Sequence, residues 1–349
     1  MEKFYSSTFF IQLLTRITIP VFPVLFILIS AFGSTATAQY QEEQLRQNLK
    51  QDYFSVGVLM QSRARYSIRN TGFQGGRTFQ VPNVRIGVSG NLDNNFYYNA
   101  LSNLVQQPAL LDAYIGWRRS DALSIQGGAM KPRMSADFIP NPVSHDFVDR
   151  SRLLGMLGVR REIGIAALGE LGSLSYYTGI FNGTGVQIND NNVFFVLARL
   201  ETALPLANDA ATLGVNASYG EVTQSPPGLI GSVDRTIVGA DVRYDDQSFL
   251  LAAEYLLGSY SSVNINNSAT LHGYYLTTGY YVADDILGLI RWQQWMHSEI
   301  DALEGSQITL GVKKFATSVV SIETNFDIYF PGTGEDAQYG LTLNANVLF

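Results

Sequence analysis

The residues best suited to bind a solute are arginines at alternating positions along one segment. Arg63, Arg65 and Arg69 share one face of residues 53–69, and Arg85 lies in the next segment. A guanidinium group can hold a carboxylate or a phosphate through two parallel hydrogen bonds, so such a face could bind small anions. The sequence therefore predicts a basic wall formed by these side chains.

A repeat of two residues places these arginines on a β-strand. Phe54, Val56, Val58 and Met60 share the other, apolar face of the same segment. Successive side chains of a strand point to opposite faces, so the segment has one apolar and one charged face. The pattern recurs and predicts sixteen strands: 53–69, 78–90, 94–102, 110–119, 122–131, 157–169, 171–182, 192–203, 211–222, 233–245, 248–259, 270–281, 285–297, 306–316, 318–329 and 337–349.

Strand length and connection length together predict an all-β fold, a transmembrane antiparallel β-barrel. Tilted strands of about ten residues cross a membrane, whereas strands of a soluble β-sandwich or β-helix average about five or six residues. Short turns such as Asp93-Asn94 and Asp284-Asp285 alternate with longer connections, as in outer-membrane barrels. The final strand ends in Phe349, which resembles the C-terminal signature of bacterial outer-membrane barrels.

The N-terminus predicts export. Lys3 and Arg16 precede an apolar run from Ile17 to Phe32, and Ala36-Thr37-Ala38 offers a cleavage site. We therefore expect a signal peptide over residues 1–38, a periplasmic lead-in over 39–52 and the barrel over 53–349. The alternative is a membrane anchor, although the run of 16 residues is just short of a span.

Composition excludes several classes of protein. The chain has no cysteine, which excludes a disulfide framework, a thiolate metal site and an N-terminal lipid-modified cysteine. Its net charge of −7 argues against nucleic acid as a partner. Only 15% of the residues are charged, against about 25% in soluble domains. We attribute this low fraction to side chains that face lipid rather than to a large dry core.

An ordered series of motifs runs from about Val84 to Leu204. These motifs are LLDAYIGW from Leu110 to Trp117, Met130-Lys131-Pro132, Asp149-Arg150-Ser151, RR-x-I-G from Arg160 to Gly164, SYYTGIFNGTG from Ser175 to Gly185 and FVLARLE from Phe195 to Glu201. In their order and spacing they resemble the phosphate-selective porin O and P family of bacterial outer-membrane porins. The resemblance implies a sixteen-stranded barrel that forms a homotrimer, with outer-membrane lipid and small anionic solutes as partners.

The longest interruption of the strand pattern runs from Pro132 to Met156 and is the third external connection. In trimeric porins the third loop folds inward and narrows the pore. We therefore expect a third external loop folded inward, a constriction loop over 132–156. Its basic residues and the lysine before it would contribute to selectivity, together with one histidine: Lys131, Arg133, His145, Arg150 and Arg152.

The polar phase of each strand predicts which residues face the lumen. Basic candidates are Arg63, Arg65, Arg69, Arg85, Arg118, Arg160, Arg199, Arg235, Arg243, Arg291 and Lys313, and acidic ones are Asp112, Glu162, Glu201, Asp241, Glu254, Glu323 and Asp327. The basic excess predicts a mildly positive lumen that favours anions. A competing hypothesis is that these arginines only form ion pairs with acidic residues of the lumen. Glu162 lies two residues after Arg160, and Glu201 lies two residues after Arg199, so each pair would share one face of a strand. In this register Arg161 would point toward lipid unless it lies at the rim of the barrel.

Nine residues follow as the predicted pore-lining or anion-binding set. They combine the basic wall with the cations of the third loop and of two further strands: Arg63, Arg65, Arg69, Arg85, Arg118, Lys131, Arg133, Arg150 and Arg160.

No motif predicts catalysis or a bound group. His145, His272 and His297 lie far apart and share no ligand spacing, and the HExxH, GxSxG and P-loop patterns are absent. The pairs Asp245-Asp246 and Asp284-Asp285 occupy short turns, where aspartate is favoured for local hydrogen bonds rather than for calcium. We therefore expect no catalytic residue, no metal and no cofactor.

These features predict a passive outer-membrane porin for small hydrophilic solutes, with a weak preference for anions that extends to phosphate. One alternative is a structural or ligand-recognition barrel whose loops close the lumen. A second alternative, suggested by the 20 Phe, 19 Tyr and 3 Trp residues, is a channel for hydrophobic solutes. The lead-in is too short and polar for the apolar plug that such a channel would need.

Overall fold

The computed structural model describes residues 50–51, 53–67, 76–93, 95–189, 192–205, 210–223, 231–262 and 268–349. All of them belong to the compact unit Gln47–Phe349. The predicted signal peptide and Arg69 lie outside the described residues, as does the predicted lead-in apart from Lys50 and Gln51.

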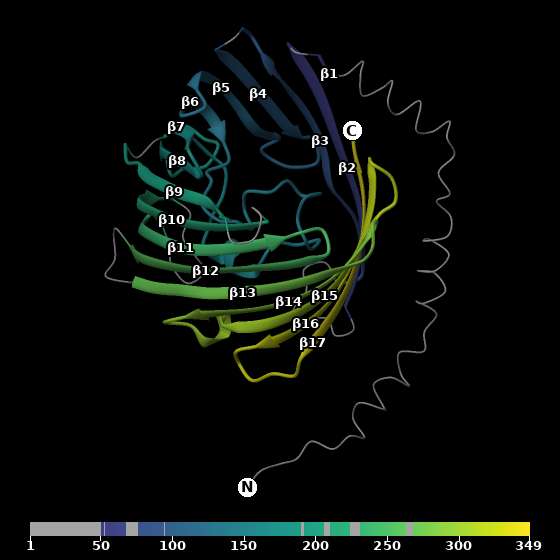
Figure 1. The fold of residues 1–349 in the computed structure, drawn as a ribbon. Coiled ribbons are helices and arrows are strands. Elements are labelled where there is room, and N and C mark those ends of the chain that lie inside the picture. The colour runs from purple at the N-terminus through teal and green to yellow at the C-terminus, as the bar shows by residue number, and fades with distance from the viewer. Residues whose placement is uncertain are drawn as a thin grey trace. The chain divides into compact units, whose positions relative to one another are not determined.

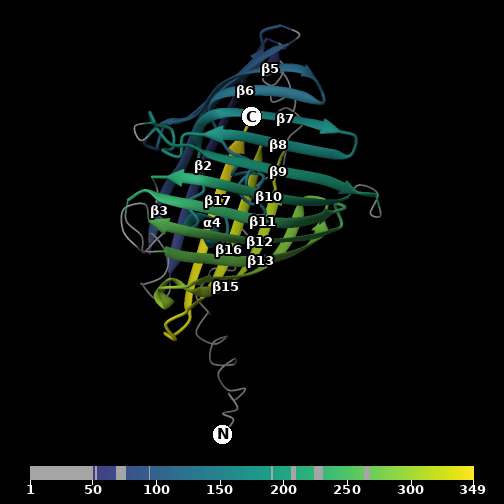
Figure 2. The ribbon, with the colours of Figure 1, turned by 90° about the vertical axis from the view of Figure 1, so that its left-hand side faces the viewer.

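Sixteen long antiparallel strands, β2 to β17, form a closed barrel within the described residues (Figures 1 and 2). The first and last strands close it, because β17 pairs with β2 and places Asn344 opposite Arg63. The sixteen-stranded barrel predicted from the alternation is therefore confirmed. The two-residue strand β1 (Lys50–Gln51) also pairs with β2. The strands are β2 (Phe54–Ser67), β3 (Thr78–Asn91), β4 (Phe96–Asn103), β5 (Leu110–Ser120), β6 (Leu123–Met130), β7 (Glu162–Leu171), β8 (Leu174–Phe181), β9 (Phe195–Leu204), β10 (Ala211–Val222), β11 (Val233–Asp245), β12 (Phe249–Ser262), β13 (Ser268–Ala283), β14 (Ile286–His297), β15 (Gly305–Phe315), β16 (Val320–Pro331) and β17 (Gln338–Leu348).

The strands β9 to β17 alternate between a buried face and a more exposed face, and the more exposed face is largely apolar. In β9, Val196 and Leu200 are exposed, while Phe195, Leu197 and Arg199 on the other face are buried. An apolar outer surface around a sheet without open edges is the surface that a bilayer requires. No helix among the described residues has the length and apolar character needed to cross a membrane.

The chain between β6 and β7, residues 131–161, is longer than predicted, and we call it the β6–β7 segment. The strand expected to begin at residue 157 begins at Glu162. The short helix α4 (Arg152–Met156) precedes residues 157–161, and these five residues form no strand. One helical turn brings Leu153 and Leu157 to the same side, where both are buried. Burial of these leucines overrides the strand pattern there.

A large apolar core lies inside the protein, so the attribution of the low charge to lipid-facing residues alone was wrong. Met134, Phe138 and Leu157 of the β6–β7 segment belong to one buried cluster with residues of the strands β6 to β14. The strand residues of this cluster include Phe181, Phe195, Leu197, Ile237, Leu256, Tyr260, Leu271 and Trp295. The barrel wall and the β6–β7 segment therefore share a dry interface.

Replacing Leu157 by alanine tests this interface. Leu157 has 0% exposed surface, so Leu157→Ala should lower the free energy of unfolding by about 2–5 kcal/mol, as buried leucine truncations do. The control is Leu200→Ala on the exposed face of β9, where lipid can fill the lost volume. Urea unfolding of the protein in lipid vesicles measures both variants. An equal or smaller loss for Leu157→Ala would contradict a packed interior.

Candidate functional site

The β6–β7 segment is bonded to the buried faces of strands that lie far apart around the barrel. Its Asp149 forms ion pairs with Arg63 and Arg65 of β2. Lys313 of β15 donates hydrogen bonds to the main-chain oxygens of Val143 and His145. These contacts attach the segment to the wall at several points.

Glu254 of β12 attaches the beginning of the segment. Its carboxylate accepts hydrogen bonds from Ser135 Oγ at 2.9 Å, from the Ala136 N–H at 3.0 Å and from the Asp137 N–H at 3.4 Å. Buried donors of this kind must be paired, since an unpaired one costs about 1–3 kcal/mol. Residues 135–137 therefore depend on Glu254 for their position.

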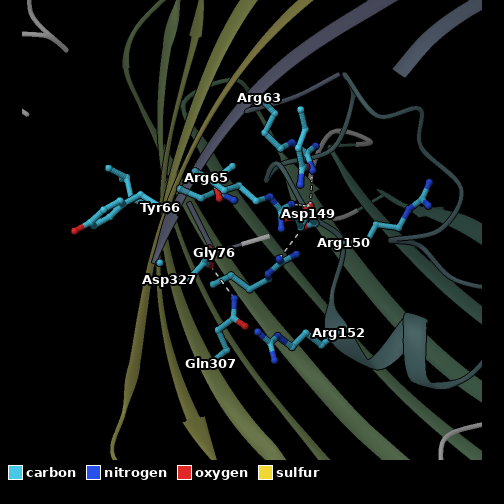
Figure 3. A pocket seen from close by; sticks show the side chains of 15 residues that line it. Arg63, Arg65, Tyr66, Gly76, Asp149, Arg150, Arg152, Gln307 and Asp327 are labelled. Atoms are coloured by element: carbon cyan, nitrogen blue, oxygen red, sulfur yellow. Dashed lines mark hydrogen bonds and ion pairs between the residues drawn. The ribbon is translucent and has the colours of Figure 1, made fainter. Parts of the chain in front are cut away.

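One cavity of about 480 Å³ lies between this segment and the strands β2 and β14 to β17. We call it the Asp149 cavity (Figure 3). Its charged lining consists of five arginines and two aspartates: Arg63, Arg65, Arg150, Arg152, Arg291, Asp149 and Asp327. The structure therefore brings together four residues expected to act in selectivity, Arg63, Arg65, Arg150 and Arg152.

Asp149 is the centre of this arginine group. Arg65 Nη2 lies 2.7 Å from Oδ1 and 2.6 Å from Oδ2, and Arg63 Nη1 lies 3.1 Å from Oδ1. Arg291 Nη2 donates to the main-chain oxygen of Asp149 at 2.9 Å. Figure 3 shows the Arg63 and Arg65 side chains pointing toward Asp149. Charge-assisted contacts of this length are among the stronger hydrogen bonds in proteins.

A second basic cavity of about 450 Å³ lies against strands β2 to β6, and we call it the Lys131 cavity. Its charged lining is four cations and one carboxylate: Arg85, Lys131, Arg133, Arg161 and Asp112. Lys131 Nζ donates to the main-chain oxygens of Ile139 at 3.1 Å and Pro140 at 3.0 Å. Backbone oxygens hold this ammonium in place without cancelling its charge.

The charge of Lys131 is sensitive to pH near neutrality. Burial, followed by repulsion from the neighbouring Arg150, Arg161 and Arg85, lowers the pKa of Lys131 to about 7, while Asp112 opposes the shift. Lys131 is therefore charged below about pH 7 and loses its charge as the pH rises through that value.

Several other arginines pair with carboxylates, as the competing hypothesis predicts. Arg160 lies 3.3 Å from Glu162 and also donates to Thr223 Oγ1 at 3.1 Å. Arg199 lies 2.7 Å from Glu201 and 2.6 Å from Asp241. These pairs hold the wall together, and neither Arg160 nor Arg199 lines the two basic cavities.

Arg161 lies at the N-terminal end of β7, as the alternative at the rim allows, and does not point toward lipid. Its guanidinium group forms two hydrogen bonds to the Asp112 carboxylate, at 2.9 and 3.3 Å. Because β7 begins at Glu162, Arg161 lies before the strand and is not held to the lipid-facing phase. It lines the Lys131 cavity instead.

Arg118 and Arg133 lie together in a third cavity, of about 350 Å³. The guanidinium carbon of Arg118 lies 5.3 Å from the centre of the Tyr97 ring, and that of Arg133 lies 5.6 Å from the centre of the Tyr177 ring. A ring face stabilises a cation without neutralising it.

The histidines and acidic pairs have structural contacts. His145 Nδ1 lies 3.7 Å from Asp137. The side chain of His145 is buried, and this burial lowers its pKa, so His145 is neutral near pH 7. Asp246 accepts hydrogen bonds from the N–H groups of Ser248 and Phe249 and so stabilises its own turn. In the part of the chain that the structure describes, no group of three or more His, Cys, Asp or Glu residues could hold a metal.

The sequence alone does not reveal the role of Asp149. Its only signal was the Asp149-Arg150-Ser151 motif, which drew attention to the arginine. The strand pattern cannot find a loop residue of this kind, because the pairing of Asp149 with β2 depends on the path of the segment between them.

Comparison with solved structures shows which proteins share the fold of this chain. The sequence matches no protein-family model and no curated protein. Among solved structures, OmpT of Vibrio cholerae matches with a TM-score of 0.64 at 10% identity, covering 86% of this chain and 99% of that one. An anion-selective porin from Comamonas acidovorans matches with a TM-score of 0.63 at 12% identity, covering 85% and 99%. The outer-membrane channel DcaP of Acinetobacter baumannii matches with a TM-score of 0.59 at 9% identity, covering 85% and 97%. This chain therefore has the fold of the outer-membrane porins.

Replacing Glu254 by leucine tests how the segment is attached. Glu254→Leu removes both acceptor oxygens, so amide hydrogen exchange of residues 134–140 should accelerate about tenfold, as expected when buried donors lose their partners. The control is Glu201→Leu, because Glu201 pairs with Arg199 on β9. Mass spectrometry after deuterium exchange measures both. Unchanged exchange in Glu254→Leu would show that other contacts position these residues.

Proposed function

We propose that this protein is a porin that lets small hydrophilic solutes diffuse passively across the bacterial outer membrane, with a preference for anions. The observation that carries this proposal is the charge of the Asp149 cavity, where five arginines face two aspartates. Fixed positive charge along a narrow water path favours anions, because screening there is weak. Guanidinium groups also match the geometry of phosphate, so phosphate belongs to the proposed solute class.

The β6–β7 segment is the proposed constriction. Its attachments to β2, β12, β14 and β15 support a path through the lumen. In this arrangement a solute passes the cations of the Asp149 cavity and those of the Lys131 cavity. The predicted anion-binding residues Arg63, Arg65, Arg85, Lys131, Arg133 and Arg150 would act here, while Arg118 would lie to one side and Arg160 would hold the wall.

The proposal also covers the location and the assembly of the protein. Residues 1–38 act as an export signal that is cleaved, and the apolar outer face of the barrel contacts outer-membrane lipid. We include a homotrimer in the proposal. It is supported by the porin fold and by the description of one structural relative, OmpT of Vibrio cholerae, as a trimer form.

A closed barrel for structure or ligand recognition is the second candidate. The buried apolar cluster favours it, because Met134, Phe138 and Leu157 of the segment pack tightly against the wall. If this packing extended across the whole lumen, ions could not pass.

Recording from single molecules in a planar lipid bilayer separates the two candidates. The porin proposal predicts discrete conductance steps in KCl and faster swelling of liposomes in small sugars. If the protein is folded and inserted in the bilayer but gives no conductance steps, the closed barrel is favoured.

The titration of Lys131 predicts how selectivity depends on pH. As the pH falls from about 8 to about 6 across its pKa of about 7, the lumen gains a positive charge and anion preference should rise. The reversal potential under a KCl gradient measures this change. Lys131→Gln, the matched control, should lose most of the pH dependence. A pH response that persists in this variant would assign the titration to another group.

A further inference from the structure

The arginines of the Asp149 cavity already hold an anion, which the chain itself supplies. Arg63 and Arg65 together contact both carboxylate oxygens of Asp149, at 2.6 to 3.1 Å. These are the contacts that a carboxylate or phosphate solute would make with the same groups. Asp149 therefore occupies the position of such a solute.

Exposure shows which partner faces the cavity. The side chain of Asp149 is 45% exposed, whereas those of Arg63 and Arg65 are 10% and 16% exposed. A solute in the cavity thus meets the carboxylate before it reaches the two guanidinium groups. To bind them it must displace Asp149.

The other carboxylate of the cavity has different partners. Asp327 accepts hydrogen bonds from Gln307 Nε2 and Thr309 Oγ1, both at 2.7 Å. Because Asp327 is held by these neutral groups, Asp149 is the residue that limits access to Arg63 and Arg65.

We propose that Asp149 is a tethered competitor for the oxyanion site formed by Arg63 and Arg65, and that it sets how tightly the channel holds a carboxylate or phosphate. This inference rests on the proposed anion-preferring channel. A ligand attached to the chain has a high effective concentration, so it weakens the binding of a free solute. Weak binding suits a channel, because a solute must leave the site as readily as it enters.

The test measures block of the chloride current by inorganic phosphate in planar bilayers. Asp149→Asn keeps the size of the side chain and removes its charge. The phosphate concentration that halves the chloride current should fall about tenfold, the effect expected from freeing charge-assisted hydrogen bonds. Asp149→Ser, a second uncharged variant, should shift the block in the same direction, while Asp149→Glu should remain near the wild type.

Asp146 provides the matched control. It lies in the same segment and pairs with Arg243 through contacts of 2.9 and 3.1 Å, so Asp146→Asn removes the same charge at another arginine. Asp146→Asn should change phosphate block less than about twofold, because charge separated by water is screened within about 10 Å at moderate salt.

A double-mutant cycle assigns the effect to the arginine pair. In an Arg65→Gln background, the effect of Asp149→Asn on phosphate block should largely disappear, because the two residues act on one site. Acetate should block like phosphate if the site recognises oxyanions in general, and phosphate alone should block if the site is narrower.

Three results would overturn the inference. They are an unchanged phosphate block in both uncharged variants of Asp149, an equal shift in Asp146→Asn, and a full shift that persists without Arg65. Failure of the proposed function would be seen separately, in the wild type, as the absence of conductance or as cation preference.

Discussion

The position of the β6–β7 segment depends on one kind of interaction. Lysine and arginine side chains of the barrel strands and of the segment itself donate hydrogen bonds to main-chain oxygens of the segment. A segment of irregular backbone that packs against barrel strands leaves carbonyl groups that must find donors. Lys131, Arg150, Arg291 and Lys313 supply these donors, the first two from the segment and the last two from β14 and β15. A carbonyl oxygen is a dipole rather than a charge, so these contacts fix the segment and leave the positive charge largely uncancelled.

The interior therefore has two different regions. Between the segment and strands β6 to β14, apolar side chains form a dry interface, and Arg199 is neutralised by Asp241 and Glu201. Along β2 to β6 and β14 to β17, the two basic cavities contain more cations than carboxylates. The dry region holds the segment, and in the proposed porin the basic cavities would provide the charged path for anions.

Sequence reasoning found the barrel because each strand contrasts an apolar face with a polar one, and this contrast is local. It also found the Arg160–Glu162 and Arg199–Glu201 pairs, whose partners are two residues apart on one face. It missed α4, the apolar core, the Arg161–Asp112 pair and Asp149, because each depends on where residues 131–161 lie in three dimensions. A period of two cannot show the path of an irregular segment.

The most direct test of the account is the sign of the reversal potential of the wild-type protein under a KCl gradient in a planar bilayer. The two basic cavities contain more cations than carboxylates, so we predict a potential of the sign produced by excess chloride permeation. A potential of the opposite sign, produced by excess potassium permeation, would contradict it.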